Sequence, residues 1–268
     1  MVRTDAGCGV SVTRYLRKKS GAKAYPPPMS LYVGTSGWAY REWKPDFYPP
    51  DVPQRAFLEH YGSRLGACEI NATFRRMQSP ETITKWRDSV PGPFRFSTKA
   101  HQGLTHTKKL APDEDKRPFF DAFVTSVKGL DDKLGVILFQ YPPYRMRDDG
   151  DLDGLLEALK GGPRFALEFR HDSWDSHEVR ERIAAAGGTV CLSETVGKVP
   201  DELPPGPLAY VRLRSERYDE AARTGWLELL QATGQERDVY AFTKHEGIPT
   251  DDPFGGIGLA VWLTESIS

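Results

Sequence analysis

The chain has 268 residues, and its 36 Lys and Arg side chains nearly balance its 37 Asp and Glu side chains. That balance excludes a global positive field of the kind that recruits nucleic acid or an anionic membrane, but it allows a local basic pocket. The length exceeds the commonest domain size and is typical of a (β/α)8 barrel, which folds as one domain.

The three cysteines, Cys8, Cys68 and Cys191, lie far apart and form no C-x-x-C pair. An odd number of scattered cysteines is typical of reduced thiols rather than a disulfide framework. No apolar run approaches the roughly 20 residues of a membrane span, and the N-terminus lacks the apolar region of a signal peptide. We therefore expect a cytoplasmic protein with no membrane partner, and the sequence does not predict its oligomeric state.

Residues 1–29 are rich in Gly, Ser and basic residues and end in Pro26-Pro27-Pro28-Met29. This composition predicts a flexible, disordered leader, followed by a barrel domain over residues 30–268. Met29 is a second candidate for the start codon, so the sequence leaves open whether residues 1–28 are translated.

From Ser30 onward, strand and helix signals alternate, which is typical of a parallel sheet with crossover helices. The crossover after the sixth strand, residues 199–207, contains four prolines and predicts a loop. Eight strands favour a (β/α)8 (TIM) barrel over an open doubly wound sheet, because no G-x-G-x-x-G follows any strand. The expected strands are 31–33, 67–72, 94–99, 136–139, 164–170, 189–193, 208–214 and 238–242.

Two of the expected helices have recognisable first residues. Ser79 followed by Pro80 predicts an N-cap and a first helical position. Asp151 precedes the apolar stripe of residues 152–159 and is expected to start that helix.

The stretch from Glu168 to Trp174 ends the fifth strand in charged residues. Because side chains alternate between the two faces of a strand, Glu168 and Arg170 share one face, opposite Phe169. Burying charges at the end of a strand is costly unless they line an open site, which favours a functional role. The alternative is structural: a buried Glu-Arg pair that only ties the strand end to its neighbours.

The carboxyl ends of the other strands are also polar, and in a barrel they converge on one mouth. Cations outnumber carboxylates among them, which predicts a pocket for a small anionic ligand, most simply a phosphate or carboxylate. The candidate acids or bases are Glu168, Glu69 and His171. The candidate ligand-binding residues are Lys99, Arg170, Arg212, Arg214, Lys244, Asn71 and Gln140, with the flanking aromatic residues Trp38 and Trp174.

A divalent metal is the competing use of Glu69, Glu168 and Glu194, with His171 and His245 as further ligands. The excess of cations and the lack of an H-x-H or H-E-x-x-H spacing make this the weaker hypothesis. We assign no metal ligand and leave the cofactor open.

Five motifs lie in order along the chain: residues 34–38, 69–74, 96–100 with Thr105 and His106, 138–143 and 168–174. Together they resemble one family, the domain of unknown function 72, over about residue 30 to the C-terminus. The resemblance implies a (β/α)8 fold distantly similar to xylose isomerases and metal-dependent apurinic endonucleases, and it implies no established activity. The chain departs from the family pattern at Arg75, Glu194 and Arg214, where Tyr, Asp and His are usual.

The sequence thus predicts that the mouth binds a phosphorylated or otherwise anionic sugar or nucleotide, for acid-base hydrolysis or isomerisation. Two alternatives stay open. One is metal-dependent phosphodiester cleavage, by analogy with apurinic endonucleases. The other is a non-catalytic module that binds nucleic acid or a phospholigand.

Overall fold

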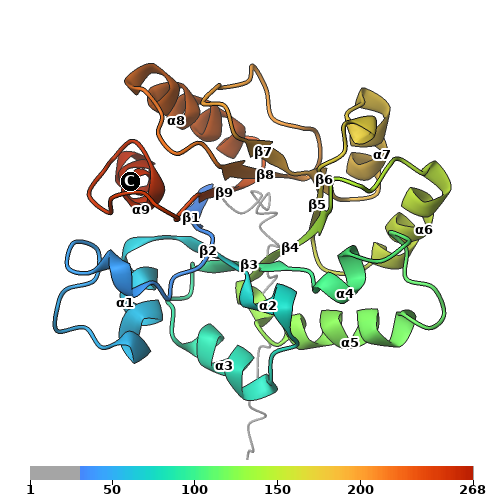
Figure 1. Cartoon of the computed structure of the whole chain (residues 1–268), viewed down its shortest axis with the longest axis horizontal. Coiled ribbons are helices and arrows are strands. Elements are labelled where there is room, and N and C mark those ends of the chain that lie inside the picture. The colour runs from blue at the N-terminus through green and yellow to red at the C-terminus, as the bar shows by residue number, and fades with distance from the viewer. Residues whose placement is uncertain (1–30, 268) are drawn as a thin grey trace, which may run out of the picture.

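A parallel sheet closes around a filled interior in the structure, a computed structural model that describes residues 31–267 (Figure 1). The predicted leader, residues 1–29, lies outside the described residues. Neighbouring strands follow the order β6-β5-β4-β3-β2-β1-β9-β8-β7, and every pair is parallel. The strands are β1 (Leu31–Thr35), β2 (Ala67–Ile70), β3 (Arg95–Lys99), β4 (Leu134–Tyr141), β5 (Phe165–Phe169), β6 (Thr189–Val190), β7 (Leu192–Glu194), β8 (Leu208–Leu213) and β9 (Asp238–Thr243).

Helices surround the strands and cover their outer faces (Figure 1). They are α1 (Phe57–Arg64), α2 (Ala72–Arg75), α3 (Pro80–Asp88), α4 (Gln102–Thr105), α5 (Arg117–Lys128), α6 (Asp149–Leu159), α7 (His177–Ala185), α8 (Glu220–Gly234) and α9 (Gly256–Ile267). Residues 195–207 contain no helix, so the predicted loop crossover is confirmed. None of the helices in residues 31–267 has both the length and the apolar character needed to cross a lipid bilayer.

The two edges of the sheet meet at Cys191. β6 pairs with β5 and β7 pairs with β8, and Cys191 alone separates β6 from β7. The Cys191 amide donates to the carbonyl of Leu167 at 2.9 Å and so continues the pairing with β5. β6 and β7 are therefore two parts of the sixth predicted strand, and the (β/α)8 prediction is confirmed.

Alternation along β5 divides its side chains between the interior and the helices. Phe165 and Leu167 pack in a buried cluster with residues of α6 and α7, such as Leu155 and Ile183. Ala166 lies in a second cluster inside the barrel. Burying each large apolar side chain outside the sheet contributes about 1.5–3 kcal/mol, and that burial sends Glu168 inward.

The structure corrects two of the predicted boundaries. β2 ends at Ile70 because Asn71 has helical dihedral angles and precedes α2. Asp148 is the N-cap of α6, and Asp151 lies inside its first turn, so the prediction for Asp151 was wrong. The Asp151 carboxylate instead accepts from the amides of residues 110 and 111, which competes with capping its own helix. Ser79 caps α3 by accepting from the Thr82 amide, as predicted.

One buried hydroxyl completes the junction between β1 and β2. Tyr61 accepts a hydrogen bond from the Thr35 amide at 2.8 Å and donates to the Ala67 carbonyl at 2.9 Å. Gly34 leaves the room for this approach, since a Cβ there would lie 1.8 Å from the Ala67 carbonyl oxygen. The phenol thus stands in for a hydrogen bond that the two strands do not make directly.

Replacing Tyr61 by Phe (Y61F) should lower the free energy of unfolding by about 1–3 kcal/mol, because a buried amide and a buried carbonyl would lose their partner. Urea unfolding measures the change. Tyr144→Phe is the matched control: Tyr144 is exposed, and its replacement should change stability by less than about 0.5 kcal/mol. Equal effects of the two substitutions would contradict the proposed role of Tyr61.

Candidate functional site

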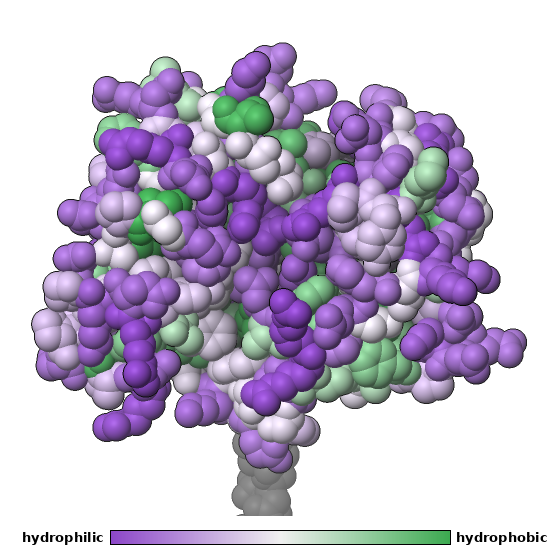
Figure 2. Space-filling model, viewed as in Figure 1, coloured by the Kyte–Doolittle hydropathy of each residue, from purple (hydrophilic) through white to green (hydrophobic). Residues whose placement is uncertain are grey.

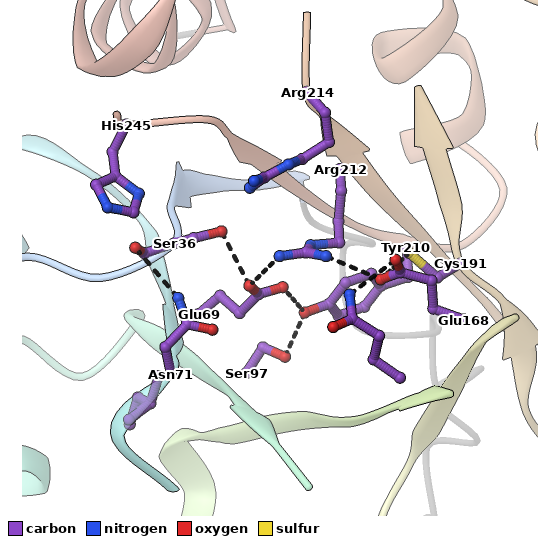
Figure 3. Close-up of polar contacts among 12 residues, drawn as sticks. Ser36, Glu69, Asn71, Ser97, Glu168, Cys191, Tyr210, Arg212, Arg214 and His245 are labelled. Carbon is purple, nitrogen blue, oxygen red and sulfur yellow. Dashed lines mark hydrogen bonds and ion pairs between the residues drawn. The ribbon is translucent and has the colours of Figure 1, made fainter. Parts of the chain in front are cut away.

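Arg212 joins two carboxylates at the carboxyl-terminal ends of the strands, here called the mouth (Figure 3). Its Nη1 lies 2.9 Å from Glu168 Oε2, and its Nη2 lies 3.0 Å from Glu69 Oε1. All three side chains are at most 5% exposed. Because no two of β2, β5 and β8 are neighbours in the sheet, this arginine ties together three separate parts of the barrel wall.

Hydroxyl groups complete the surroundings of Glu69. Ser36 donates to Glu69 Oε1 at 2.9 Å, and Tyr210 donates to Oε2 at 2.8 Å. The Tyr210 hydroxyl also lies 2.6 Å from Ser97 Oγ. Glu69 is thus held by two hydroxyls and one guanidinium, and both of its oxygens are occupied.

Glu168 is held by a different set of donors. Gln140 donates to its Oε1 at 2.8 Å, and Arg170 Nε lies 3.4 Å from the same oxygen. The Cys191 thiol lies 3.9 Å from Oε2. Burial by itself raises the pKa of Glu168, but Arg212, Gln140 and Arg170 outweigh it and hold the pKa below its ordinary value of 4.5. Glu168 is therefore a carboxylate at neutral pH.

Lys99 ends β3 on the inner face of the strand, two residues after Ser97. Its Nζ lies 4.3 Å from the centre of the Phe74 ring. Burial lowers the pKa of Lys99 to about 8, and the charges of Arg212 and Arg170 add to this while Glu69 and Glu168 oppose it. A lysine that loses its proton this readily can act as a base or a nucleophile near neutral pH.

Further cations gather on the rim of the mouth. Burial lowers the pKa of His106, and the charges of Lys99, Arg170 and Arg75 lower it further, so these groups share one positive region. Arg170 is half exposed. Hydrophilic residues gather over the middle of this face of the molecule (Figure 2). The mouth thus combines a buried ionic cluster with a positive rim.

Arg214 lies above Arg212 on the same side of the mouth (Figure 3), and its nearest carboxylate is Glu246 at 3.8 Å. Lys244 is paired with Glu216 at 3.2 Å. His245 stacks on Tyr40 with ring centres 4.1 Å apart, and burial lowers its pKa. These residues form the β8 and β9 side of the mouth.

His171 does not contact Glu168. Its Nδ1 accepts from the Ser173 amide at 3.1 Å and caps the short 3-10 helix Asp172–Trp174. With Glu168, Arg170 and Cys191 it lines a pocket of about 280 Å³ beside the ends of β5 and β6. The structure thus brings His171 to the edge of the site and leaves it outside the ionic cluster.

The remaining predicted residues lie around this centre. Asn71 donates to the Ser36 carbonyl at 3.5 Å. Trp174 is buried, stacks on Phe169 and donates to the Arg145 carbonyl. Trp38 packs edge-on against Trp86. The two tryptophans therefore support the loops of the mouth rather than its centre.

Glu194 lies at a strand end but turns away from the mouth. Its Oε1 accepts from the amides of residues 196, 197 and 198, and its Oε2 accepts from Tyr218 at 2.5 Å. This carboxylate therefore orders the loop after β7, and both of its oxygens accept hydrogen bonds there.

The carboxylates of the mouth do not fit a divalent metal site. The guanidinium of Arg212 occupies the position between Glu69 and Glu168 where a shared cation would bind. Within residues 31–267, no three His, Cys, Asp or Glu side chains converge in a way that could hold a metal ion. We therefore derive no chemical step through a metal.

Several residues of the site were not among the sequence candidates, namely Ser36, Phe74, Ser97, Cys191 and Tyr210. Alternation along a strand puts Ser97 on the face of Lys99, and Tyr210 on the face of Arg212. That signal was available, but Tyr and Ser on a strand are so common that their type alone does not distinguish site from core.

The fold and the site define a (β/α)8 barrel with a buried Glu-Arg-Glu cluster at its mouth. The chain belongs to the family described as protein of unknown function DUF72, whose pattern matches residues 32–250. This confirms the family that the sequence motifs resemble.

The chain is 32% identical over 151 residues to the UPF0759 protein YunF of Bacillus subtilis, a match of 54% of this chain and 52% of that protein. It is 25% identical over 158 residues to the UPF0759 protein YecE of Escherichia coli, 59% of this chain and 54% of that protein. The chain spans about half the length of these curated relatives.

Two solved structures share the fold. A DUF72 family protein from Thermotoga maritima has a TM-score of 0.69 at 22% identity, covering 88% of this chain and 98% of that one. A DUF72 family protein from Enterococcus faecalis has a TM-score of 0.66 at 17% identity, covering 89% and 98%.

Replacing Arg212 by Met (R212M) should lower the free energy of unfolding by about 3–5 kcal/mol at neutral pH, because the buried charges of Glu69 and Glu168 would lose their shared cation and only Glu168 would keep another, the half-exposed Arg170. Burial would then raise the pKa of Glu168, so the variant should gain stability as the pH falls toward about 5. The wild type should show no such gain. In the wild type, Glu168 makes its full contribution to the free energy of unfolding above its ordinary pKa of 4.5. That contribution is lost as the pH falls through the lowered pKa of the folded state.

Urea unfolding across this pH range measures both trends. Arg214→Met is the matched control. The carboxylate beside Arg214 is that of Glu246, which is 3.8 Å away and exposed, so losing this weak pair should change stability little. An R212M variant that follows the pH dependence of the wild type would overturn the assignment of the cluster.

Proposed function

We propose that the mouth binds a small anionic ligand, a phosphorylated or otherwise acidic sugar or a nucleotide, and converts it by acid-base chemistry. The observation that carries the proposal is the ion pairing of both buried carboxylates with Arg212, which leaves that cluster with one net negative charge. Lys99, Arg170 and Arg214 add three positive charges around it, so a positive excess remains to attract an anion even though Arg170 also pairs with Glu168 and Arg214 with Glu246.

The protonation state of Glu168 narrows the chemistry. A carboxylate with a lowered pKa can accept a proton but has none to donate at neutral pH. Proton abstraction, as in isomerisation, therefore suits it better than the protonation of a leaving group in hydrolysis. Lys99 supplies a second titratable group within the same positive region.

Replacing Arg170 by Gln (R170Q) should weaken the binding of inorganic phosphate or a sugar phosphate by about 10- to 100-fold, because one charge-assisted hydrogen bond is lost. Isothermal titration at low salt measures the dissociation constant. The Glu168→Gln variant should still bind the sugar phosphate but should no longer convert it, since the amide of glutamine cannot accept the proton that the carboxylate would take.

Arg117→Gln is the control for nonspecific charge. Arg117 lies on α5, is exposed and is paired with Asp121. Unchanged phosphate affinity in R170Q, or an equal loss in both arginine variants, would reject the anion site.

A groove beside the mouth favours nucleic acid as a second candidate ligand. Its volume is about 790 Å³, and its lining includes Lys108, Lys109 and Arg145. Tyr144 and Met146, also in the lining, are 66% and 65% exposed. The lining also holds Asp113, Asp148 and Asp151. Cations beside an exposed aromatic ring such as that of Tyr144 are nevertheless the combination with which proteins bind single strands.

If this second function holds, replacing Lys108 and Lys109 together by Ala should reduce the slope of log affinity against log salt by roughly 1.4 for single-stranded DNA. Fluorescence anisotropy of a labelled oligonucleotide measures the slope. The exposed pair Lys85 and Lys128, replaced in the same way, is the control. Identical slopes for the two double variants would exclude the groove.

A further inference from the structure

Lys99 is held rigidly at the end of β3. Thr73 Oγ1 donates to the Lys99 carbonyl at 2.7 Å, and the amide of Ala100 donates to Leu138 at 2.8 Å. These bonds fix the backbone on both sides of the peptide unit. The side chain therefore enters the mouth from a fixed point, and its amine rests against the Phe74 ring.

The amine of Lys99 has no ion pair among residues 31–267. The two nearby carboxylates, Glu69 and Glu168, direct their oxygens to Arg212, to Arg170 and to neutral donors instead. Lys244 provides the contrast, because its amine at the end of β9 is paired with Glu216 at 3.2 Å. An unpaired, half-buried amine next to fixed positive charge is the arrangement in which a lysine acts as a nucleophile.

The positive neighbours of Lys99 also lower its affinity for a proton. Burial and the charges of Arg212 and Arg170 bring the pKa from 10.5 to about 8. About one amine in ten is then unprotonated at pH 7, several hundredfold more than for an ordinary lysine. The free amine is the species that attacks a carbonyl carbon.

We propose that Lys99 forms an imine with an aldehyde or ketone ligand that also carries a phosphate or carboxylate. The proposal rests on the anion site proposed above and names its substrate class, an acidic carbonyl compound such as a sugar phosphate. Arg170, on the rim, binds the acidic group, and Lys99 takes the carbonyl carbon.

The reaction balances without an oxidant or reductant. The Nζ lone pair forms a C–N bond while the carbonyl π electrons move to oxygen, which takes up a proton. The proton on oxygen is one of the two that the amine carried. The resulting carbinolamine loses its hydroxyl group together with the remaining nitrogen proton as one molecule of water, leaving C=N. When protonated, this imine withdraws electrons from the adjacent carbon and acidifies its hydrogen, and the ionised Glu168 can accept such a proton.

Reductive trapping of the full chain tests the proposal. The probes are glyceraldehyde 3-phosphate and unphosphorylated glyceraldehyde, each about equimolar with protein and each with cyanoborohydride. Peptide mapping by mass spectrometry should place the adduct on Lys99 at least about tenfold faster than on Lys160, an exposed lysine of ordinary reactivity. The phosphorylated probe should react faster than the unphosphorylated one.

Lys99→Arg (K99R) separates the imine from anion binding. This variant keeps the positive charge and should still bind inorganic phosphate in titration, but its adduct at position 99 should disappear. Lys160→Arg is the control and should trap as the wild type does. Adducts spread evenly over surface lysines, or an undiminished total adduct in K99R, would overturn the imine proposal.

The two proposals fail separately. Phosphate binding that depends on Arg170, without trapping at Lys99, would leave the anion site standing and remove the imine. The opposite result is trapping at Lys99 that is equally fast with both probes, together with normal phosphate binding by R170Q. It would reject the anion site and leave only a reactive lysine. The substrate class named here would then be wrong as well.

Discussion

The bridge from Arg212 to Glu69 and Glu168 is the interaction on which the rest of the mouth depends. It connects β8 with β2 and β5, strands that no backbone hydrogen bond joins. Its two carboxylates have oxygens facing a common guanidinium, so each residue fixes the position of the other two. A buried ion pair of this kind is weak evidence for stability, because desolvation opposes the attraction. Its clearer consequence is a defined arrangement of charge.

That arrangement separates two electrostatic roles. The buried cluster uses one positive charge to satisfy two negative ones, and hydroxyls and an amide satisfy the remaining oxygens. Of the cations nearer the rim, Arg170 is half exposed and shares Glu168 at 3.4 Å, and Lys99 has no ion pair among residues 31–267. If Glu69 had paired with Lys99 instead of Arg212, the amine would keep its proton more firmly.

Much of this organisation could be predicted from the sequence. Alternation along β5 and β8 puts Glu168 and Tyr210 on inward faces, because the apolar residues that alternate with each of them pack against helices. The same alternation continues from β6 through Cys191 into β7. It puts Glu194 on the outer face of the sheet with Leu192, so the direction of Glu194 away from the mouth was also predictable. The pairing of Arg212 with two carboxylates could not be predicted. It depends on how far neighbouring strands are staggered in the closed barrel, and the local sequence does not determine that stagger.

The chemistry of the two kinds of cation assigns them different tasks. A guanidinium stays charged at any relevant pH and presents a fork that matches a phosphate, so Arg170 and Arg214 are suited to hold an acidic group. An amine can do this only while protonated, and it can attack a carbonyl only while unprotonated. Lys99 cannot do both in the same complex. Since its surroundings favour release of the proton, the proposed function assigns the anion to the arginines and the carbonyl to Lys99.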